Sequence, residues 1–463
     1  MNRYKIIMQD KTFLRKALMI TVPVALQNLL NNVLNLVDTL MIGQLGETTV
    51  AAIGLANKVF FVYSLLLFGI CSGSGILAAQ YWGKRDFYNI RRVLSIAILL
   101  GLGASSIFLL PSLFCPEVVM KIFTPQAATI SIGADYLTIV ALSYPITAVT
   151  MAYVSVLRSM NYVKIPVIMT SISILVNATL NYILIFGKLG FPVMGVKGAA
   201  LATLIARIVE CSSLLILVHR NKVGDDGLGD LVHYKRDPKD KDRYFNKPFL
   251  MKFFLTASPV IANEFMWGLG VTMYSLVYGR MGDAATAAVT ITNTVEQVIL
   301  VFFFGVCSAA SVILGNELGA NELEKAEEYA KNFIAIQFLL TLLGSLLTLL
   351  IKEPIINLFA VSETVANYIR ICLTVFAIAI PIRMQNALFI VAILRSGGDT
   401  KAALLLDVTA VWLIGIPMAV LGGLILDLPV FLVYSMILVE EVYKLIFSFR
   451  RYKQKRWLRN IVA

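Results

Sequence analysis

Four side chains whose oxygen atoms could bind a cation lie within apolar stretches of this 463-residue chain: Asp38, Asn177, Asn181 and Thr203. Asn177 and Asn181 are four residues apart, so on a helix they share one face. A carboxylate together with amide and hydroxyl oxygens is a hard donor set, which small hard cations accept. We therefore predict a cation-binding site in which Asp38 carries the charge. The alternative interpretation is that both asparagines only link neighbouring helices through hydrogen bonds.

Glu264 and Arg383 are charged residues in the interior of two further apolar stretches. A charge inside hydrocarbon costs several kcal/mol, so each one needs a partner or a role. Counting along the two stretches places Glu264 and Arg383 at similar depth, which predicts an ion pair between them. In that pair Glu264 would be a structural partner or a gate more than a cation ligand. The alternative is that Arg383 faces a water-filled cavity alone.

The elements that must position these residues are helices. Hydrophobic residues make up 58% of the chain and charged residues only 15%, whereas a soluble protein carries roughly a quarter charged residues. Each apolar stretch reaches the roughly 20 residues needed to span a bilayer, and backbone groups in lipid are satisfied within helices. The sequence predicts an all-α integral membrane protein with twelve transmembrane helices, at about 16–42, 48–80, 90–112, 128–155, 165–187, 195–218, 250–278, 284–314, 329–351, 366–394, 402–424 and 428–449.

An internal repeat divides these helices into two sets. The segment 43–52 recurs as 279–288, and Pro23 recurs with the same spacing as Pro259. Internal pseudo-symmetry of this kind is usual in secondary transporters. It predicts two pseudo-symmetric six-helix lobes around a central cavity. The predicted domains are an N-terminal lobe 1–220, a cytoplasmic linker 221–247, a C-terminal lobe 248–449 and a basic cytoplasmic tail 450–463.

Lys58 and Glu296 lie near equivalent positions of the repeat, about two helical turns inside their stretches. We predict a contact between them that latches the extracellular side, with snorkelling or local pairing as the alternative. Further charged residues cluster toward the predicted inner helix ends, where we expect structural roles at helix interfaces: Arg207, Glu210, Asp407, Glu440, Glu441 and Lys444.

The net charge of +12 does not indicate binding to nucleic acid, because most of the 40 Lys and Arg residues fall in the two terminal regions and the loops on the same side. This positive-inside pattern predicts that both termini are cytoplasmic. His219 and His233 have no metal-ligand spacing, and the sequence has no phosphate-binding loop. We therefore predict a protein that is not an enzyme, has no cofactor and takes its energy from an ion gradient.

In order along the chain, a set of short motifs resembles the multidrug and toxic compound extrusion (MATE) transporters of the bacterial type. The motifs are Val37-Asp38-Thr39, Gly43-Gln-Leu-Gly46, Arg158-Ser159, Lys164-Ile-Pro166, Asn177-Ala-Thr-Leu-Asn181, Gly187-Lys-Leu-Gly-Phe-Pro192, Gly198-Ala-Ala-Leu-Ala-Thr203 and Glu441-Val-Tyr-Lys444, followed by Arg450, Arg451 and Trp457. The resemblance implies two six-helix lobes around a central cavity. It also implies efflux of amphipathic, often cationic compounds in exchange for Na⁺ or H⁺, and it matches Asp38 to the acidic position of the family's first helix.

The sequence departs from the family pattern at two places. Asn181 is neutral where many relatives carry an acidic residue, which weakens cation attraction. An acidic residue such as Glu264 is a feature of the Na⁺-coupled branch, but that branch also carries an aspartate near position 384, and the segment 381–386 has no acid. The choice between Na⁺ and H⁺ therefore stays open, and a cation site in the C-terminal lobe is in doubt.

These features together predict a multidrug efflux antiporter of the cell membrane that works by alternating access. It would exchange Na⁺ or H⁺ for small amphipathic or cationic organic compounds, as a monomer surrounded by membrane lipid and without a nucleic-acid partner. The alternative is a lipid-linked oligosaccharide flippase of the same superfamily. A flippase would require a strongly cationic cavity to hold pyrophosphate, whereas Arg383, Arg207 and Lys58 are few and dispersed.

Overall fold

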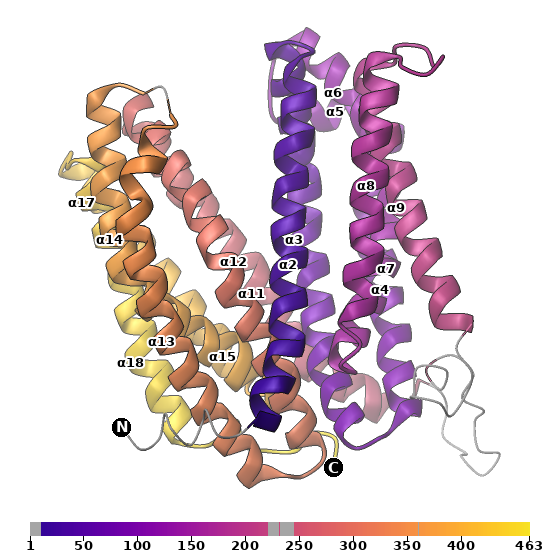
Figure 1. Cartoon of the computed structure of the whole chain (residues 1–463), viewed down its shortest axis with the longest axis vertical. Helices are drawn as coiled ribbons and strands as arrows, with labels where there is room; N and C mark the ends of the chain where they lie inside the picture. The colour runs from indigo at the N-terminus through magenta and orange to yellow at the C-terminus, as the bar shows by residue number, and fades with distance from the viewer. Residues whose placement is uncertain (1–10, 221–230, 232–244, 360) are drawn as a thin grey trace. The chain divides into compact units, whose positions relative to one another are not determined.

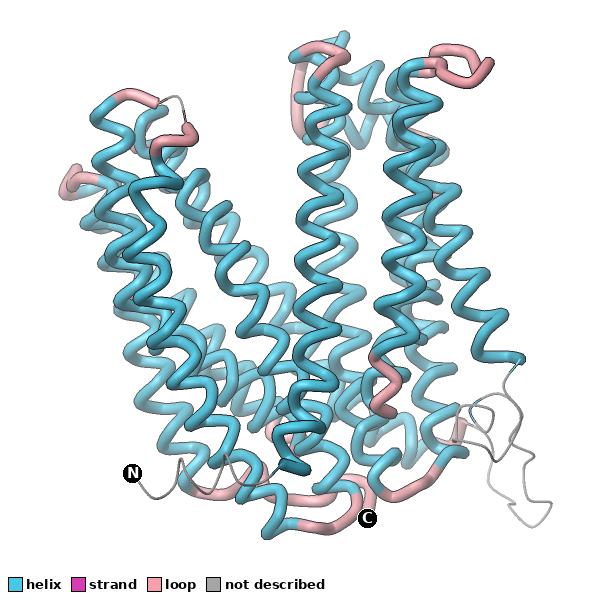
Figure 2. Tube along the Cα trace, in the orientation of Figure 1, coloured by secondary structure: helices cyan, strands magenta, loops and turns pink. Residues whose placement is uncertain are grey.

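The computed structural model describes residues 11–220, 231, 245–359 and 361–463. Within these residues the chain is almost entirely helical and contains no β-strand (Figure 2). Ten helices of the described part are long and apolar enough to cross a membrane, and a pair bent by 48° is an eleventh candidate. Two consecutive shorter helices cover the twelfth predicted stretch, 428–449. The prediction of an all-α polytopic membrane protein is confirmed.

Most helices of the two halves are labelled in Figure 1. The first half contains α2 (Lys11–Gly43), α3 (Glu47–Gly83), α4 (Phe87–Phe114), α5 (Pro116–Lys121), the bent pair α6 (Ala127–Val140) and α7 (Ser143–Ser159), α8 (Lys164–Phe186) and α9 (Gly195–Arg220). The second half contains α11 (Lys247–Arg280), α12 (Asp283–Gly319), α13 (Leu323–Ile356), α14 (Glu363–Ala387), α15 (Thr400–Ala410), α16 (Ile416–Val420), α17 (Val430–Ile437) and α18 (Val439–Lys453). Three π-helical segments interrupt the second half: η1 (Leu388–Leu394), η2 (Val411–Gly415) and η3 (Leu421–Ile425).

The repeat in the sequence is also present in the positions where helices begin and end. Helices α3 and α12 each have 37 residues, and they begin and end at equivalent positions of the repeat. Each follows a glycine with positive φ, Gly46 at 103° and Gly282 at 107°. A side chain is disfavoured in that backbone region, so the repeated glycines permit the tight turn between consecutive helices.

The contacts of the chain define two compact units. We call residues Leu26–Ile261 the N-unit, and Met1–Ala25 together with Ala262–Ala463 the C-unit. The limits therefore fall inside α2 and α11, just after the repeated prolines Pro23 and Pro259, and at equivalent positions of the repeat. The predicted linker 221–247 lies outside the described residues except for 231 and 245–247, so that domain limit stays a prediction.

The first part of α11 belongs to the N-unit because it packs closely on α3. A Cβ atom added at Gly73 would lie 2.7 Å from the Cα of Ala257. The first part of α2 packs in the same way on α12 in the C-unit, where a Cβ at Gly305 would lie 2.9 Å from the carbonyl oxygen of Thr21. Glycine permits this close approach of helices. Each half of the repeat thus contributes the beginning of its first helix to the other unit.

The residues of the predicted tail 450–463 pack within the C-unit. Trp457 is fully buried, and Arg451 forms an ion pair with Asp399 at 2.6 Å. Arg459 donates to the carbonyl oxygens of Gly397 and Gly398. The predicted tail 450–463 is therefore an ordered part of this unit in the structure.

The glycine contact predicts a difference between two alanine substitutions in the N-unit. Gly73→Ala should lower the free energy of unfolding by about 1–3 kcal/mol, because the new methyl group overlaps the backbone of α11. Thermal unfolding of the purified protein in detergent measures this effect. Gly103→Ala in α4 is the control, since no atom lies within 4 Å of its added Cβ, and alanine should stabilise that helix slightly. Equal stability of the two variants would contradict the contact.

Candidate functional site

The four residues predicted to form a cation site come together in the N-unit. Asp38 is on α2, Asn177 and Asn181 are on α8, and Thr203 is on α9. The Asn181 amide nitrogen donates to Asp38 Oδ1 at 2.7 Å and to Asn177 Oδ1 at 3.1 Å. The Asn177 amide nitrogen donates to Thr203 Oγ1 at 3.4 Å. One hydrogen-bonded chain therefore links three helices, and α8 and α9 lie side by side in it (Figure 1).

The site is held by the buried face of α8. Asn177 and Asn181 are 4% and 2% exposed, one helical turn apart, and Asp38 is half-buried. Asn181 uses its nitrogen for both of its hydrogen bonds, and its Oδ1 atom has no hydrogen-bond partner. A buried acceptor without a donor is costly unless something binds it. Asn181 Oδ1 is therefore available to a cation next to the Asp38 carboxylate.

The donor set suits a monovalent cation or a proton. Asp38 is the single carboxylate of this set, and the other donors are neutral oxygens. Among the described residues no group of three or more His, Cys, Asp or Glu side chains is arranged to hold a metal ion. A site with one negative charge and neutral oxygens matches the charge of Na⁺ or H⁺, because no charge remains unbalanced after binding.

A second polar chain in the N-unit was not predicted from the sequence. Arg158 on α7 donates to Gln27 Oε1 at 2.5 Å, and Gln27 donates to Thr170 at 2.8 Å. Thr170 donates in turn to Glu210, which forms an ion pair with Arg207 at 2.8 Å. The signal in the sequence was the recurrence of Arg158 as Arg395 in the second half of the repeat.

The predicted pair of Glu264 and Arg383 is wrong, because each residue has another partner in the C-unit. Glu264 accepts from Arg395 at 2.7 Å, and the Arg395 side chain is only 2% exposed. Arg383 donates to Glu296 at 2.7 Å, and Glu296 also accepts from Tyr434. Counting residues along a helix estimates depth but does not define which face a side chain is on, and this is why the partners were missed.

Glu296, predicted to form a latch with Lys58, has two partners in its own unit. It is 5% exposed and engages Arg383 and Tyr434 within its own unit. Lys58 is exposed on α3. Within the C-unit Glu296 is the partner of Arg383, and the latch with Lys58 stays a prediction.

At equivalent positions of the repeat, the two halves form polar contacts between helices with different residues. In the N-unit Gln27 both donates to Thr170 and accepts from Arg158. In the C-unit Asn263 donates to Asp407 at 3.0 Å, while Glu264 accepts from Arg395. In the repeat, Asp407 corresponds to Thr170 and Arg395 to Arg158. Neutral partners of the first half are thus replaced by carboxylates in the second half.

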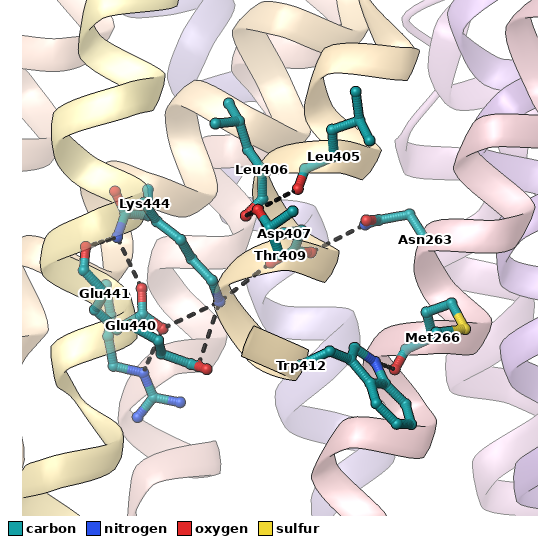
Figure 3. A network of polar contacts seen from close by, with 12 residues as sticks. Asn263, Met266, Leu405, Leu406, Asp407, Thr409, Trp412, Glu440, Glu441 and Lys444 are labelled. Atoms are coloured by element: carbon teal, nitrogen blue, oxygen red, sulfur yellow. Dashed lines mark hydrogen bonds and ion pairs between the residues drawn. The ribbon is translucent and has the colours of Figure 1, made fainter. Parts of the chain in front are cut away.

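Four of the charged residues expected at helix ends form one buried network in the C-unit (Figure 3). Lys444 lies 3.1 Å from Asp407, 3.4 Å from Glu440 and 3.7 Å from Glu441. Asn263 joins the network through Asp407, and the Trp412 ring nitrogen beside it donates to the carbonyl oxygen of Met266 (Figure 3). These residues connect α11, α15, η2 and α18.

Comparison with known proteins identifies the family of this chain. The model of the MatE family matches residues 23–183 and 259–421. The uncharacterized transporter YisQ of Bacillus subtilis (strain 168) is 23% identical over 454 residues, which cover 98% of this chain and 97% of YisQ. The multidrug resistance protein NorM of Photobacterium profundum is 24% identical over 417 residues, covering 89% and 88% of the two chains.

Solved structures show the same fold. The crystal structure of the Vibrio cholerae MATE transporter VcmN in the bent form superposes with a TM-score of 0.84 at 18% identity, covering 96% of this chain and 97% of that one. The protein therefore has the polytopic helical fold of the MATE transporters. More specifically, the chain belongs to the MatE family, because the family model matches both halves of the repeat over most of the sequence.

The ion pairs predict a specific pattern of rescue in double mutants. Arg395→Met should destabilise the protein by about 3–5 kcal/mol, because it leaves the Glu264 carboxylate buried without a counter-charge. Glu264→Gln in the Arg395→Met background should recover part of that loss, as measured by thermal unfolding in detergent. The matched control is Glu264→Gln combined with Arg383→Met, where no recovery is expected. Recovery in that control instead would support the pair that the structure contradicts.

Proposed function

We propose that this protein is a multidrug efflux antiporter, which exports small amphipathic or cationic organic compounds in exchange for Na⁺ or H⁺. The observation that carries the proposal is the buried chain of Asp38, Asn181, Asn177 and Thr203 with its unpartnered Asn181 oxygen. A lone carboxylate in an apolar helix bundle is maintained at a cost, so it requires a role. Binding of a coupling cation is the role that its neighbours support.

The relatives support the class of substrate. NorM of Photobacterium profundum is named as a multidrug resistance protein, and it is similar to this chain over nearly the whole of both sequences. We infer from this similarity that the chain acts on several organic compounds. We infer further that it works as a monomer in the cell membrane, with both termini in the cytoplasm.

The mechanism follows from the charge of Asp38. A proton or Na⁺ that binds from the outside neutralises Asp38 and changes its bond to Asn181, which joins α2 to α8. Helix α2 contains Pro23, so its two parts can change their angle without breaking a regular hydrogen-bond ladder. The cation thereby biases the packing of the N-unit toward the state that releases substrate outward. Release of the cation inside then resets Asp38 for the next cycle.

Neutralising the coupling carboxylate tests this proposal. Asp38→Asn should abolish gradient-driven efflux from proteoliposomes, because asparagine cannot bind a proton or supply a charged ligand. Efflux of a fluorescent cationic dye is measured under a Na⁺ gradient and, separately, under a proton gradient. The gradient that drives efflux in the wild type identifies the coupling ion.

The matched control for Asp38→Asn is Asp135→Asn in the same unit. Asp135 is on α6, about half exposed, and pairs with the exposed Lys197 at 3.2 Å. Its substitution should leave efflux close to the wild-type rate, since an exposed ion pair contributes little. Drug resistance that is unchanged in cells with Asp38→Asn would refute the mechanism.

Asn181 should affect affinity more than the maximal rate. Asn181→Ala removes the bond to Asp38 and the free oxygen ligand, so the cation concentration for half-maximal efflux should rise about tenfold, the effect of losing roughly 1.4 kcal/mol. Thr179→Ala on the exposed side of the same helix is the control and should not change this concentration. Equal half-maximal concentrations in the two variants would exclude Asn181 from the cation site.

A further inference from the structure

The C-unit contains a buried network with more negative than positive groups. Among the described residues it joins four carboxylates to two cationic side chains through contacts of 3.9 Å or less: Asp407, Glu296, Glu440 and Glu441 with Lys444 and Arg383. The adjoining pair of Arg395 and Glu264 is balanced by itself. An excess of buried negative charge is costly in a medium of low dielectric constant. The network therefore requires additional positive charge.

The ion pairs distinguish Glu440 from the other three carboxylates, because neither cation has Glu440 as its nearest partner and Glu440 has one cationic neighbour where Glu441 has two. Arg383 lies closest to Glu296 at 2.7 Å, and Lys444 lies closest to Asp407 at 3.1 Å. Glu441 lies between both cations and also accepts from Asn386 at 2.7 Å. Within the described parts of the chain Lys444, at 3.4 Å, is the one cationic side chain paired with Glu440. The Glu440 side chain is also the more buried of the two neighbouring glutamates, 8% against 13% exposed.

Glu440 lies in a narrow niche between the Tyr274 hydroxyl group and Gly415. The Tyr274 hydroxyl donates to Glu440 Oε2 at 2.5 Å. A Cβ atom at Gly415 would overlap both that hydroxyl oxygen and Glu440 Oε2, so any other residue would fill the niche. Gly415 ends the π-helical segment η2, and such segments are frequent at functional sites.

The repeat relates this niche to the Asp38 site of the N-unit. Tyr274 corresponds to Asp38, and Glu440 corresponds to Thr203 with a shift of one residue in the spacing. Each half therefore has one carboxyl and one hydroxyl group at these two positions. The carboxyl is at the first position in the N-unit (Asp38) and at the second position in the C-unit (Glu440). Lys444 likewise corresponds to Arg207, so a cationic residue follows one turn later in both halves.

We propose that Glu440, between Tyr274 and Lys444, is a proton-binding site of the C-unit. Glu440 takes a proton from water to form the neutral carboxylic acid and returns it to water, and its protonated form reduces the excess negative charge of the network. A metal ion is disfavoured here, because the Lys444 ammonium group would repel it. The titratable and charged groups that face Glu440 are Tyr274 and Tyr278 on α11, Asp407 on α15, and Glu441 and Lys444 on α18. The network continues beyond Glu441 to Arg383 on α14, and through Arg383 to Glu296 on α12 and Tyr434 on α17.

Two further features would allow the hydrogen bonds of the network to rearrange when a carboxyl group gains or loses a proton. The Oδ1 atoms of Asn263 and Asn386 are buried acceptors without a partner, while their nitrogens donate to Asp407 and Glu441. Asp407 and Asn263 also line a small hollow together with Met266, Trp267, Val408 and Val411. A proton that arrives at one carboxyl turns an acceptor into a donor, for which these oxygens are available.

Infrared difference spectroscopy of the purified full-length protein tests the proposal directly. All spectra are recorded in the Asp38→Asn background, which removes the proposed carboxyl site of the N-unit; there the C=O band of a protonated carboxyl group should be present at mildly acidic pH and disappear on titration to alkaline pH. Glu440→Gln should lack this band, and it should fold, because glutamine has the shape of the neutral acid. Tyr274→Phe should keep the band but change the pH at which it disappears.

Matched variants determine what would overturn the proposal. Glu353→Gln, whose glutamate pairs with Arg370 outside the network, should keep the band unchanged. Retention of the band in Glu440→Gln, or its loss in Glu441→Gln or Asp407→Asn instead, would refute the assignment to Glu440. If Glu440→Gln does not fold, a Tyr274→Phe titration identical to that of Asp38→Asn alone would refute it equally.

A role of this proton in transport rests on the proposed antiport, whereas the protonation itself does not. In proteoliposomes, Glu440→Gln should reduce the number of protons moved for each exported dye molecule, while Asp38→Asn should stop coupled efflux. Loss of the infrared band without a change in the proton count would place the site outside the transport cycle. Loss of coupling in Asp38→Asn would then still support the proposed function.

Discussion

A charged or polar side chain withdrawn from water must find its partner inside the same helix bundle, and this constraint organises the rest of the structure. The C-unit meets it with ion pairs such as Arg395 with Glu264 and Arg383 with Glu296. The N-unit meets it mainly with neutral groups, as in the bonds of Gln27 to Arg158 and Thr170. Breaking a buried pair leaves an uncompensated charge, so each partner constrains the position of its helix.

The repeat explains why the two units share a scaffold and differ in their polar residues. Turn glycines such as Gly46 and Gly282 and close contacts such as those at Gly73 and Gly305 recur because the backbone geometry requires them. Most of the side chains that hold charge do not recur. They have diverged at equivalent positions, so each unit has its own set of titratable groups on a common frame of helices.

Much of the fold and of the N-unit site could be predicted from the sequence. The apolar stretches define the helices, because a helix satisfies its backbone groups within its own segment in lipid. The spacing of Asn177 and Asn181 placed both on one face, and the structure brings Asp38 and Thr203 into the same hydrogen-bonded chain. The partner of Arg383 could not be predicted, because several carboxylates lie at similar depth and only the packing of helices selects one.

The sequence by itself determined the class of fold, the internal repeat and the shared helix face of Asn177 and Asn181, since all three depend on local composition and helical spacing. The tertiary structure alone decided which parts of α2 and α11 belong to which unit, and which acid faces which base. The physical reason is that hydrophobic length and periodicity are properties of one helix. An ion pair between helices depends on rotation and register, which are set by packing against all the neighbours at once.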